Sequence, residues 1–285
     1  MAAKVGILVI HGMGSQSPGY SEPLGDEVSR RLGDGARHAV WQEIYWADAI
    51  ADRERRLWCC MQGAVDPTGR PIRLDWRRVR EFVVHNFGDA IAYQRDLSET
   101  ESTYAAIHER VSEAIAALKR ELPSPDAPIV VMAHSLGAHI MSNYIWDRQN
   151  PRPDRDDSLE DLPGLCSFLT FGCSISLFSL AFPIARPITV PGPAIREPLR
   201  TEARWLNFLD RDDVLGWPIR PLYEKNEVAL TNAQRRTVDR IEEHEVNAGS
   251  LLKSWNPASH TEYWTDDDLT RPVAAHLRQL LAAIG

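Results

Sequence analysis

Residues 128–139 have the sequence PIVVMAHSLGAH, an apolar run that ends at a serine and continues directly into residues that favour a helix. The apolar part is typical of a strand buried on both faces of a parallel sheet. Ser135 has small residues two positions before and two positions after it, Ala133 and Gly137. A sharp strand-to-helix turn requires this spacing, because the strained backbone at the serine leaves no room for larger side chains. We therefore predict that Ser135 stands exposed at such a turn, above the end of a central strand.

The helix expected after Ser135 would place unpaired backbone N–H groups next to the serine. At the start of a helix the backbone N–H groups have no partner inside the helix, so they attract negative charge. The N–H of Leu136 would face an oxyanion formed when the Ser135 hydroxyl attacks a carbonyl group. The alternative interpretation is that Ser135 caps an ordinary helix that follows a parallel strand. Further motifs are needed to distinguish the two.

A second motif follows the first apolar run of the chain. Residues 5–10, VGILVI, are typical of a buried parallel strand, and they lead into His11-Gly12-Met13-Gly14. Glycines in such a loop allow the backbone to approach a substrate closely. The alternatives are a glycine-rich turn without a function and a phosphate-binding loop. The second is disfavoured, because neither a G-x-G-x-x-G pattern nor a Walker lysine follows.

A cluster of acidic residues follows another predicted strand, residues 205–209 with the sequence WLNFL. The acids are Asp210, Asp212 and Asp213. A serine–histidine pair needs a carboxylate that fixes the imidazole tautomer and stabilises the imidazolium formed during attack. Any of the three aspartates could instead be a solvated turn residue.

Together these motifs resemble the α/β-hydrolase family. The family pattern at the turn is G-x-S-x-G, in which Ala133 replaces the first glycine, and residues 11–14 match its H-G-x-G form. The resemblance implies an α/β-hydrolase fold, with a mostly parallel central sheet flanked by helices and with cap and lid insertions. It also implies an order along the chain of serine, acid and histidine.

The resemblance assigns roles to five residues. It implies a catalytic triad and an oxyanion hole formed by two backbone N–H groups. The triad would be Ser135, Asp213 and His260, and the oxyanion donors would be Met13 and Leu136. For the acid, Asp212 is the second choice and Asp210 the third. His11 and His134, which belong to the same two motifs, would be structural.

The choice of histidine also depends on position in the chain. Only His244, His260 and His276 follow the acidic cluster. His244 lies in a run of glutamates, and His276 flanks the apolar face of the closing helix, where we expect it to be half-exposed. His139 lies one turn after Ser135, but its side chain should point along the helix rather than over its first turn. His260 precedes the closing helix, which is the position of the histidine in this family.

The chain is expected to form a single domain over residues 1–285, with two insertions. Residues 47–97 have no obvious place in the sheet and are predicted to form a cap. They contain an apolar stripe at helical spacing, which we expect to pack in a core rather than face substrate. Residues 173–203 are rich in proline and apolar residues and are predicted to form part of a lid, or else a loop packed on the domain.

Composition excludes several classes of protein. The net charge is −8, and the 32 basic residues are dispersed, so a nucleic-acid-binding surface is not indicated. The four cysteines have neither metal-ligand spacing nor a disulfide pattern, and the first residues lack the features of a signal peptide, which predicts a cytoplasmic location. Residues 162–185 are uncharged, but their glycines and prolines favour a strand and a loop over a transmembrane helix.

The function expected from these features is that of a serine hydrolase. It would cleave carboxylic esters or related acyl compounds through an acyl-enzyme intermediate, and we expect the substrate to be a small lipophilic molecule. We expect no metal or organic cofactor. The same residues would also suit a thioesterase, an amidase or an acyltransferase, and a binding or scaffold protein could keep the fold without turnover.

Overall fold

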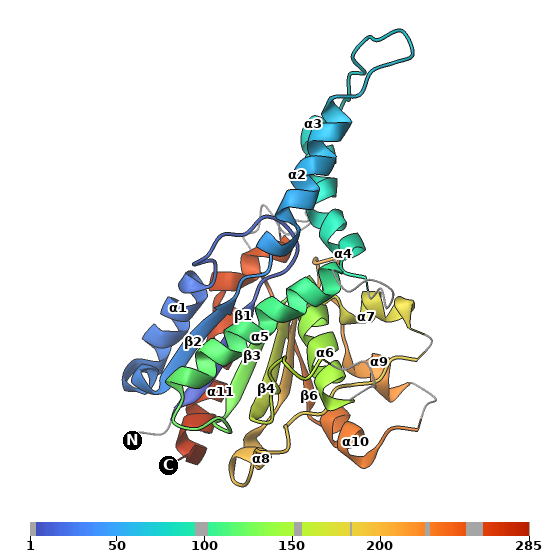
Figure 1. Cartoon of the computed structure of the whole chain (residues 1–285). Helices are drawn as coiled ribbons and strands as arrows, with labels where there is room; N and C mark the ends of the chain where they lie inside the picture. Colours follow the sequence, from blue (N-terminus) through green and yellow to red (C-terminus); the bar gives the residue numbers. More distant parts are fainter. Residues whose placement is uncertain are drawn as a thin grey trace.

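The computed structural model describes residues 4–94, 102–150, 156–182, 184–225, 229–248 and 259–284. It contains one sheet of six parallel strands flanked by helices (Figure 1), so the predicted α/β class with a parallel central sheet is confirmed. The strands are β1 (Val5–Ile10), β2 (Ala39–Ile44), β3 (Ile129–His134), β4 (Leu165–Phe171), β5 (Trp205–Asp210) and β6 (Ile241–Val246).

The order of the strands determines where a ligand can bind. The sheet runs β2-β1-β3-β4-β5-β6, and every neighbouring pair is parallel. From β1 the chain first goes to one side, to β2, and then crosses to the other side, to β3. The segments that leave β1 and β3 therefore diverge, and in such sheets ligands bind at this point, beyond the carboxyl ends of the strands.

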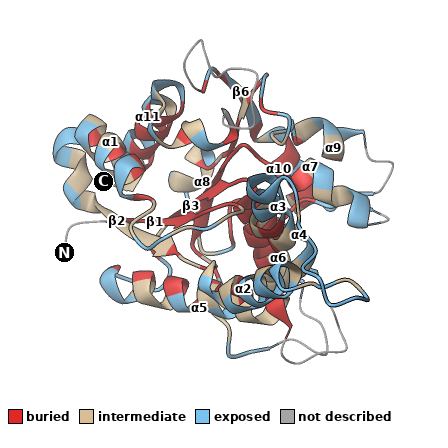
Figure 2. Cartoon of the chain, turned by 90° about the horizontal axis from the view of Figure 1, so that it is seen from above, coloured by how far each residue is buried: buried red, intermediate tan, exposed pale blue. Residues whose placement is uncertain are grey.

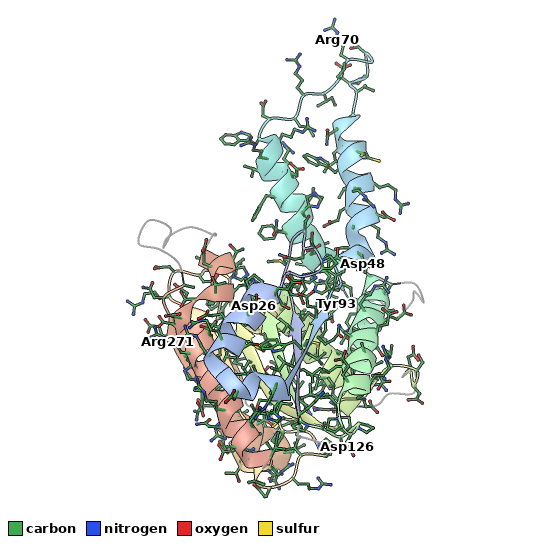
Figure 3. All side chains as sticks on the ribbon, turned by 90° about the vertical axis from the view of Figure 1, so that its left-hand side faces the viewer. Asp26, Asp48, Arg70, Tyr93, Asp126 and Arg271 are labelled. Carbon is green, nitrogen blue, oxygen red and sulfur yellow. The ribbon has the colours of Figure 1, made fainter. Side chains whose placement is uncertain are left out.

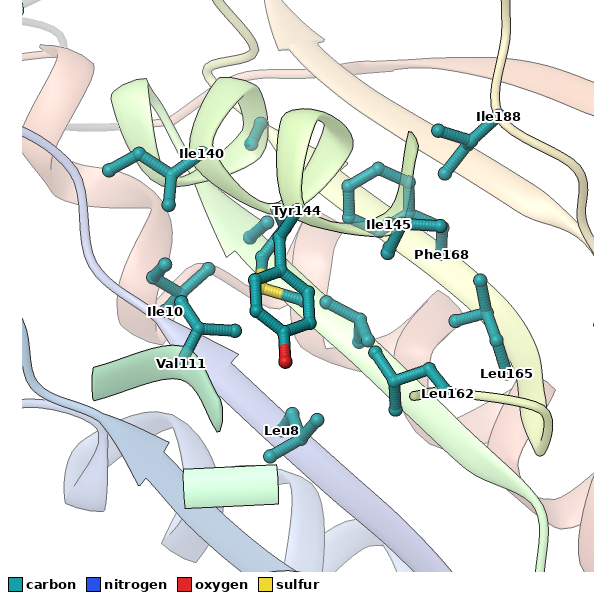
Figure 4. Close-up of a cluster of buried hydrophobic side chains, with 14 of the residues drawn as sticks. Leu8, Ile10, Val111, Ile140, Tyr144, Ile145, Leu162, Leu165, Phe168 and Ile188 are labelled. Carbon is teal, nitrogen blue, oxygen red and sulfur yellow. The ribbon is translucent and has the colours of Figure 1, made fainter. Parts of the chain in front are cut away.

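Helices cover both faces of the sheet (Figure 2). Helices α1 (Glu22–Leu32) and α11 (Asp267–Ile284) pack on one face, and α5 (Thr103–Glu121) and α6 (Leu136–Gln149) pack on the other. Side chains of β1 alternate between the faces, with Ile7 on the α1 side and Leu8 on the α5 side. Figure 4 shows part of the apolar cluster that α6 buries against the sheet.

Short elements complete the domain. Residues 238–246, for which the sequence fits strand and helix equally well, contain β6 at the edge of the sheet. An edge strand faces solvent, which explains its polar sequence, IEEHEV. The remaining short elements are η1 (Gly33–His38), α8 (Leu199–Glu202), α9 (Arg220–Glu224), α10 (Asn232–Asp239) and η4 (Ser259–Thr265).

Residues 48–92 form an arm that stands away from the carboxyl end of the sheet (Figures 1 and 3). The arm consists of α2 (Asp48–Gln62), α3 (Arg77–Phe82), one π-helical turn η2 (Val83–Phe87) and α4 (Gly88–Ala92). It occupies most of the predicted cap, 47–97, of which residues 95–97 lie outside the described residues. The expectation that its apolar stripe packs in a core is wrong, because Trp76, Val79 and Phe82 are all at least half-exposed.

The predicted lid segment, 173–203, has two different parts. Its first part forms α7 (Ile175–Phe178) and η3 (Ser179–Ala181), and Leu180 is 85% exposed there. Its second part packs on the domain, where Ile188, Val190 and Ile195 are buried. Pro183 lies outside the described residues. In the part of the chain that the structure describes, no helix has the length and apolar character needed to cross a bilayer.

The start of α6 gives a test of this packing. A Cβ atom on Gly137 would lie 2.4 Å from the carbonyl oxygen of His11, a backbone atom that cannot rotate away. Glycine-to-alanine changes inside helices normally stabilise a protein, by about 0.5–1 kcal/mol. We expect Gly137→Ala to do the opposite and to lower the free energy of unfolding by about 1–3 kcal/mol, because the helix must move.

The matched control is Gly25→Ala in α1, where the nearest contact of the new Cβ would be an ordinary 3.8 Å, to Trp41. This change should raise the free energy of unfolding in the same urea titrations. Stabilisation by both substitutions would show that α6 does not start as close to the His11 carbonyl as described.

Candidate active site

Ser135 has a strained backbone at the junction of β3 and α6. Its φ is 52° and its ψ is −124°, and Trp76 is the only other described non-glycine residue with positive φ. The Ser135 N–H donates a hydrogen bond to the carbonyl oxygen of Phe171 in β4, at 3.1 Å. This bond to the neighbouring strand helps to hold the serine in a conformation that it would otherwise avoid.

Two glycines allow the segment after β1 to lie directly against this turn. A Cβ atom on Gly12 would lie 2.5 Å from the Cβ of Ser135, and one on Gly137 would overlap with the His11 carbonyl. Neither position can hold a larger side chain without a shift of the backbone. The structure thus brings the His11–Gly14 loop and the Ser135 turn together at the point where the strand order reverses.

The three residues expected to form a triad are in hydrogen-bond contact. The Oγ of Ser135 lies 2.6 Å from Nε2 of His260, and Nδ1 of His260 lies 2.8 Å from Oδ2 of Asp213. An ionised carboxylate only accepts hydrogen bonds, so Nδ1 carries the proton in the neutral imidazole. Nε2 is then free to accept the hydrogen of the Ser135 hydroxyl. All three residues are buried, so the expectation that Ser135 stands exposed above the sheet is wrong: the residues packed around the turn cover it completely.

Asp213 is fixed by further donors. The N–H of Leu215 donates to Oδ1 at 2.9 Å, and the Tyr263 hydroxyl donates to Oδ2, also at 2.9 Å. Burial alone would raise the pKa of the Asp213 carboxyl, but its hydrogen bond with His260, the charge of His260 and these two donors outweigh it. The pKa of Asp213 is therefore below its usual value, and the group is a carboxylate at neutral pH.

The other two candidate acids have different surroundings. Asp210 accepts hydrogen bonds from the backbone N–H groups of Ala248 and Asp212, at 2.6 and 2.7 Å. Asp212 is exposed. Of the three aspartates, only Asp213 contacts His260.

Tyr263 is a residue of the site that sequence reasoning missed. Besides its bond to Asp213, its hydroxyl accepts a hydrogen bond from the N–H of Asp210 at 2.9 Å. Residues three apart on a 3₁₀-helix lie on the same side, and His260 and Tyr263 are three apart on η4. The spacing could have suggested a shared partner only if the 3₁₀-helix had been predicted.

His134 and His11 have structural contacts, as the resemblance implied. His134 Nε2 lies 2.7 Å from the carbonyl oxygen of His260, so its N–H fixes the backbone that carries the imidazole. His11 stacks on Trp46 and contacts the carbonyl oxygen of Gly12 through Nδ1 at 2.8 Å. Burial lowers the pKa of His11 to about 4 and that of His134 to about 3, so both side chains are neutral.

The two proposed oxyanion donors lie on adjacent segments. Leu136 is the first residue of α6 and is buried, and Met13 lies between the two glycines of the loop after β1, packed against the core. Gly14, the next residue, donates its N–H to Oδ2 of Asp89 at 2.7 Å. Asp89 is on α4, so the base of the arm holds this loop, which no sequence pattern indicated.

Asp89 is a buried carboxyl group. Burial raises its pKa, and the negative charge of Glu54 on α2 adds to the rise, whereas the hydrogen bond from Gly14 opposes it. The pKa of Asp89 therefore lies well above that of an ordinary aspartate. The Glu54 carboxylate also accepts a hydrogen bond from His85, at 2.9 Å.

A cavity with both aromatic and polar lining residues lies next to His139, one turn along α6 from Ser135. It has a volume of about 380 Å³, and Tyr93, Tyr104, Trp146, Phe178 and Phe182 are among the residues that line it. His139 stacks on Phe178, with ring centroids 4.6 Å apart, and its Nε2 lies 3.1 Å from Nδ2 of Asn143. As expected, His139 does not contact Ser135.

His276 differs from its expected exposure. It is buried rather than half-exposed, and its Nε2 lies 2.9 Å from Oγ of Ser167 in β4. The serine of this second serine–histidine pair lies inside β4, next to a register shift in the pairing with β3, and not at a strand-to-helix turn. All four cysteines are free, and among the described residues no group of three or more histidine, cysteine, aspartate or glutamate side chains is arranged to hold a metal ion.

Comparison with known proteins identifies no family: no family model matches the chain, and no curated protein matches it significantly. The chemistry of the site therefore has to be argued from its own geometry. A serine hydroxyl that donates to a neutral imidazole, itself oriented by a carboxylate, can act as a nucleophile toward an electrophilic carbonyl.

The buried histidines predict how stability depends on pH. Burial lowers the pKa of His139 and His276 to about 4, as it does for His11, and that of His134 to about 3. Their pKa in the unfolded chain is about 6.5, so below that pH the unfolded state binds protons that the folded state does not. Stability should therefore fall as the pH falls from 6.5, by a few kcal/mol in total between pH 7 and pH 5.5, because the four histidines outweigh Asp89, whose raised pKa acts in the opposite direction.

Urea titrations at the two pH values measure this loss. In His139→Asn the loss should be smaller by about 1 kcal/mol, because one group that binds a proton on unfolding is gone. An identical loss in the wild type and the variant would contradict the assignment of a depressed pKa to His139.

Proposed function

We propose that the protein is a serine hydrolase of the α/β-hydrolase fold that cleaves carboxylic esters. The observation that carries the proposal is the chain of hydrogen bonds from Ser135 through His260 to Asp213, at 2.6 and 2.8 Å, ending at a serine in a strained strand-to-helix turn. Each residue has the partner that its role in acyl transfer requires. The order along the chain, serine, acid and histidine, is that of the family.

In the proposed reaction, His260 acts first as a base and then as an acid. Nε2 takes the proton of Ser135 as Oγ forms a bond to the carbonyl carbon of the ester. The imidazolium then gives this proton to the departing alcohol, which leaves an acyl group on Ser135. Water attacks the acyl-enzyme with His260 again as the base, and the carboxylic acid and the free serine are released. Asp213 stabilises the imidazolium throughout and stays ionised.

The carbonyl oxygen becomes negative in both tetrahedral intermediates. The N–H groups of Leu136, at the start of α6, and of Met13, in the loop after β1, are the proposed donors to this oxyanion. Because they belong to the folded backbone, they need no reorganisation as charge develops. Ser135 is fully buried, so substrate has to displace neighbouring side chains before it can react.

Two features support the α/β-hydrolase fold beyond the parallel sheet. The strand order places the segments after β1 and β3 side by side, as an oxyanion loop and a nucleophile turn require. The insertions lie at the carboxyl end of the sheet, the arm between β2 and β3 and the α7 segment between β4 and β5. We propose that the arm is the cap predicted for residues 47–97, and that the α7 segment is part of the lid predicted for residues 173–203.

The cavity beside His139 favours a lipophilic acyl group. It begins one helical turn from Ser135, and aromatic side chains from α6, α7 and the end of the arm line it. Burial lowers the pKa of His139 to about 4, so no positive charge borders the cavity from this side at neutral pH. An acyl chain bound against these aromatic rings would bury apolar surface, and the one carboxylate in the lining, that of Asp147, already accepts a hydrogen bond from Tyr104 at 2.8 Å.

Covalent labelling with a fluorophosphonate tests the proposal. The wild type should be labelled at Ser135, and both Ser135→Ala and His260→Ala should lose the label. Hydrolysis of p-nitrophenyl esters should fall by about 10⁴-fold or more in Ser135→Ala. Esters of graded chain length measure how well the cavity accepts an acyl group.

Ser167→Ala is the matched control, because Ser167 also lies within hydrogen-bond distance of a histidine Nε2, at 2.9 Å, but inside strand β4 rather than at a strand-to-helix turn. This variant should keep its label and its esterase activity. A folded wild type that is neither labelled nor active would contradict the proposal and would indicate a binding protein. Labelling with turnover of thioesters or amides only would contradict the assignment to esters.

We expect Asp89 to act as a positioning residue for the loop that contains Met13, so its substitution should also affect turnover. In Asp89→Ala the N–H of Gly14 loses its acceptor, and displacement of the loop should lower kcat by about tenfold or more. Asp89→Asn keeps an acceptor oxygen and, like a protonated Asp89, carries no charge, so it should recover most of kcat. KM should change less than kcat, because the oxyanion forms only after substrate binds.

This prediction is tested by steady-state kinetics on the wild type, Asp89→Ala and Asp89→Asn, with circular dichroism to check that each protein is folded. Equal losses of kcat in the folded alanine and asparagine variants would contradict the role of the hydrogen bond to Gly14.

A further inference from the structure

The large exposed apolar side chains of this protein are gathered at one end. Nine of the fifteen among the described residues are on the arm, and the other six are on the segments that follow β4 and β5. All fifteen therefore lie beyond the carboxyl ends of the strands. Those on the arm are Leu57, Val65, Ile72, Trp76, Val79, Phe82, Val83, Phe87 and Ile91, and the others are Leu177, Leu180, Phe182, Ile184, Val214 and Trp217.

The outer part of the arm has no core of its own. From residue 67 to residue 83 every side chain except that of Leu74 is exposed (Figure 2). Trp76 is 77% exposed, although burial of an indole ring is strongly favourable. Exposed apolar surface of this extent on one projecting element is characteristic of a docking surface.

The same part of the arm is positively charged. The outer part of the arm, residues 55–84, contains seven arginines and three acidic residues, and one of these arginines, Arg55, pairs with Asp52 just outside this range. That gives a net charge of +4, whereas the chain as a whole carries −8. The whole arm, residues 48–92, has eight arginines and seven acidic residues, so the positive charge is concentrated in its outer part.

Several of these arginines have no partner in the protein. Among the described residues, none lies within hydrogen-bond or ion-pair distance of the guanidinium groups of Arg56, Arg70, Arg73 and Arg78. Arg70 is at the far end of the arm, as Figure 3 shows. Arg77, in contrast, donates to Gln62 at 2.6 Å and lies over the ring of Trp58. The unpaired groups are available to an external anion.

We propose that the arm docks this protein on an anionic lipid surface. Arginines beside exposed tryptophan, phenylalanine and isoleucine are the combination that binds such a surface, since the charges attract anionic headgroups and the apolar side chains enter the interface. A second copy of the chain is a poorer occupant, because pairing the arms would bring like charges together. A nucleic acid would use the arginines and leave the apolar side chains in water.

Docking would also bring the candidate active site toward the lipid. The base of the arm contacts the loop after β1 through the hydrogen bond between Gly14 and Asp89. The exposed apolar residues of the α7 segment lie at the same end of the sheet as Ser135. The inference goes beyond the proposed hydrolase, and binding to vesicles is measured without turnover, so either proposal can fail alone.

Cosedimentation with vesicles tests the docking. The wild type should bind vesicles of phosphatidylglycerol and phosphatidylcholine at low ionic strength, bind pure phosphatidylcholine far more weakly, and dissociate as salt is added. The triple variant Arg70→Glu, Arg73→Glu, Arg78→Glu should bind on the order of 100-fold more weakly, since each arginine near an anionic leaflet contributes about fivefold. The double variant Ile72→Ser, Trp76→Ser should also bind more weakly, by about tenfold or more.

The control carries the same charge reversal at the opposite end of the molecule. Arg120, Arg235 and Arg236 are exposed, and they lie on α5 and α10 away from the arm. Changing these three residues to glutamate should leave vesicle binding within about twofold of the wild type, because their distance from the surface exceeds the screening length. Equal losses in the control and the arm variant would overturn the proposal.

The exposed cysteines of α2 give a second readout. Cys59 and Cys60 are exposed, whereas Cys166 and Cys173 are buried, and burial raises the pKa of both buried thiols to about 12. An environment-sensitive maleimide should therefore react on the arm, and its emission should shift to the blue when anionic vesicles are added.

Three further results would overturn the proposal. The first is absence of binding to anionic vesicles by the folded wild type. The second is a fall in oligomeric state, measured by light scattering, in the arm variants, which would make the arm a contact between copies. The third is undiminished vesicle binding in the Ile72→Ser, Trp76→Ser variant, which would indicate a general polyanion site such as one for nucleic acid.

Discussion

The close approach of two chain segments at the carboxyl end of the sheet is the constraint on which the rest of this structure depends. The carbonyl of His11 lies against Gly137, and the backbone of Gly12 lies against Ser135. This contact requires glycine at both positions, and it requires that β1 and β3 be neighbours, which the strand order provides. It puts the loop that contains Met13 beside the first turn of α6, and it positions Ser135 under the imidazole of His260.

The electrostatics of the site follow from its burial. Several histidines lie near it, and burial keeps His11, His134 and His139 uncharged. His260 alone has a carboxylate partner in the buried Asp213. A positive charge that develops on His260 is therefore stabilised, whereas a charge on the neighbouring rings is not. The arrangement distinguishes one imidazole from the others without any difference in residue type.

Local patterns in the sequence were sufficient for the strand at residues 5–10 and the turn at Ser135, whereas Asp213 and His260 were chosen through the resemblance to a known family. The strand over residues 5–10 and the turn at Ser135 follow from an uninterrupted apolar run and from small residues at fixed spacing, and both depend only on nearby residues. The choice of Asp213 rather than Asp210 was correct as a contact with His260, although adjacent acids differ only in the direction in which a loop points them. The roles of these residues in catalysis stay a prediction.

Contacts between distant segments could not be predicted from the sequence. The hydrogen bond from Gly14 to Asp89 joins residues 75 positions apart, and no periodicity marks Asp89 as different from other aspartates. The stripe through Trp76 has the spacing of a buried helix face, yet it is exposed, because helical spacing does not say what a face meets. The arginines of the arm already lie together in the sequence, within residues 53–80, but the sequence did not show that this stretch stands away from the domain (Figure 1).

The crystal structure of the protein with an alkylboronic acid would test the central claim most directly, because a boronate bound to a serine imitates the tetrahedral intermediate. We predict a covalent bond between boron and Oγ of Ser135, with one boronate oxygen accepting hydrogen bonds from the N–H groups of Met13 and Leu136 and another near Nε2 of His260. A boronate bound elsewhere, or an imidazole of His260 turned away from Ser135 in that complex, would contradict the account.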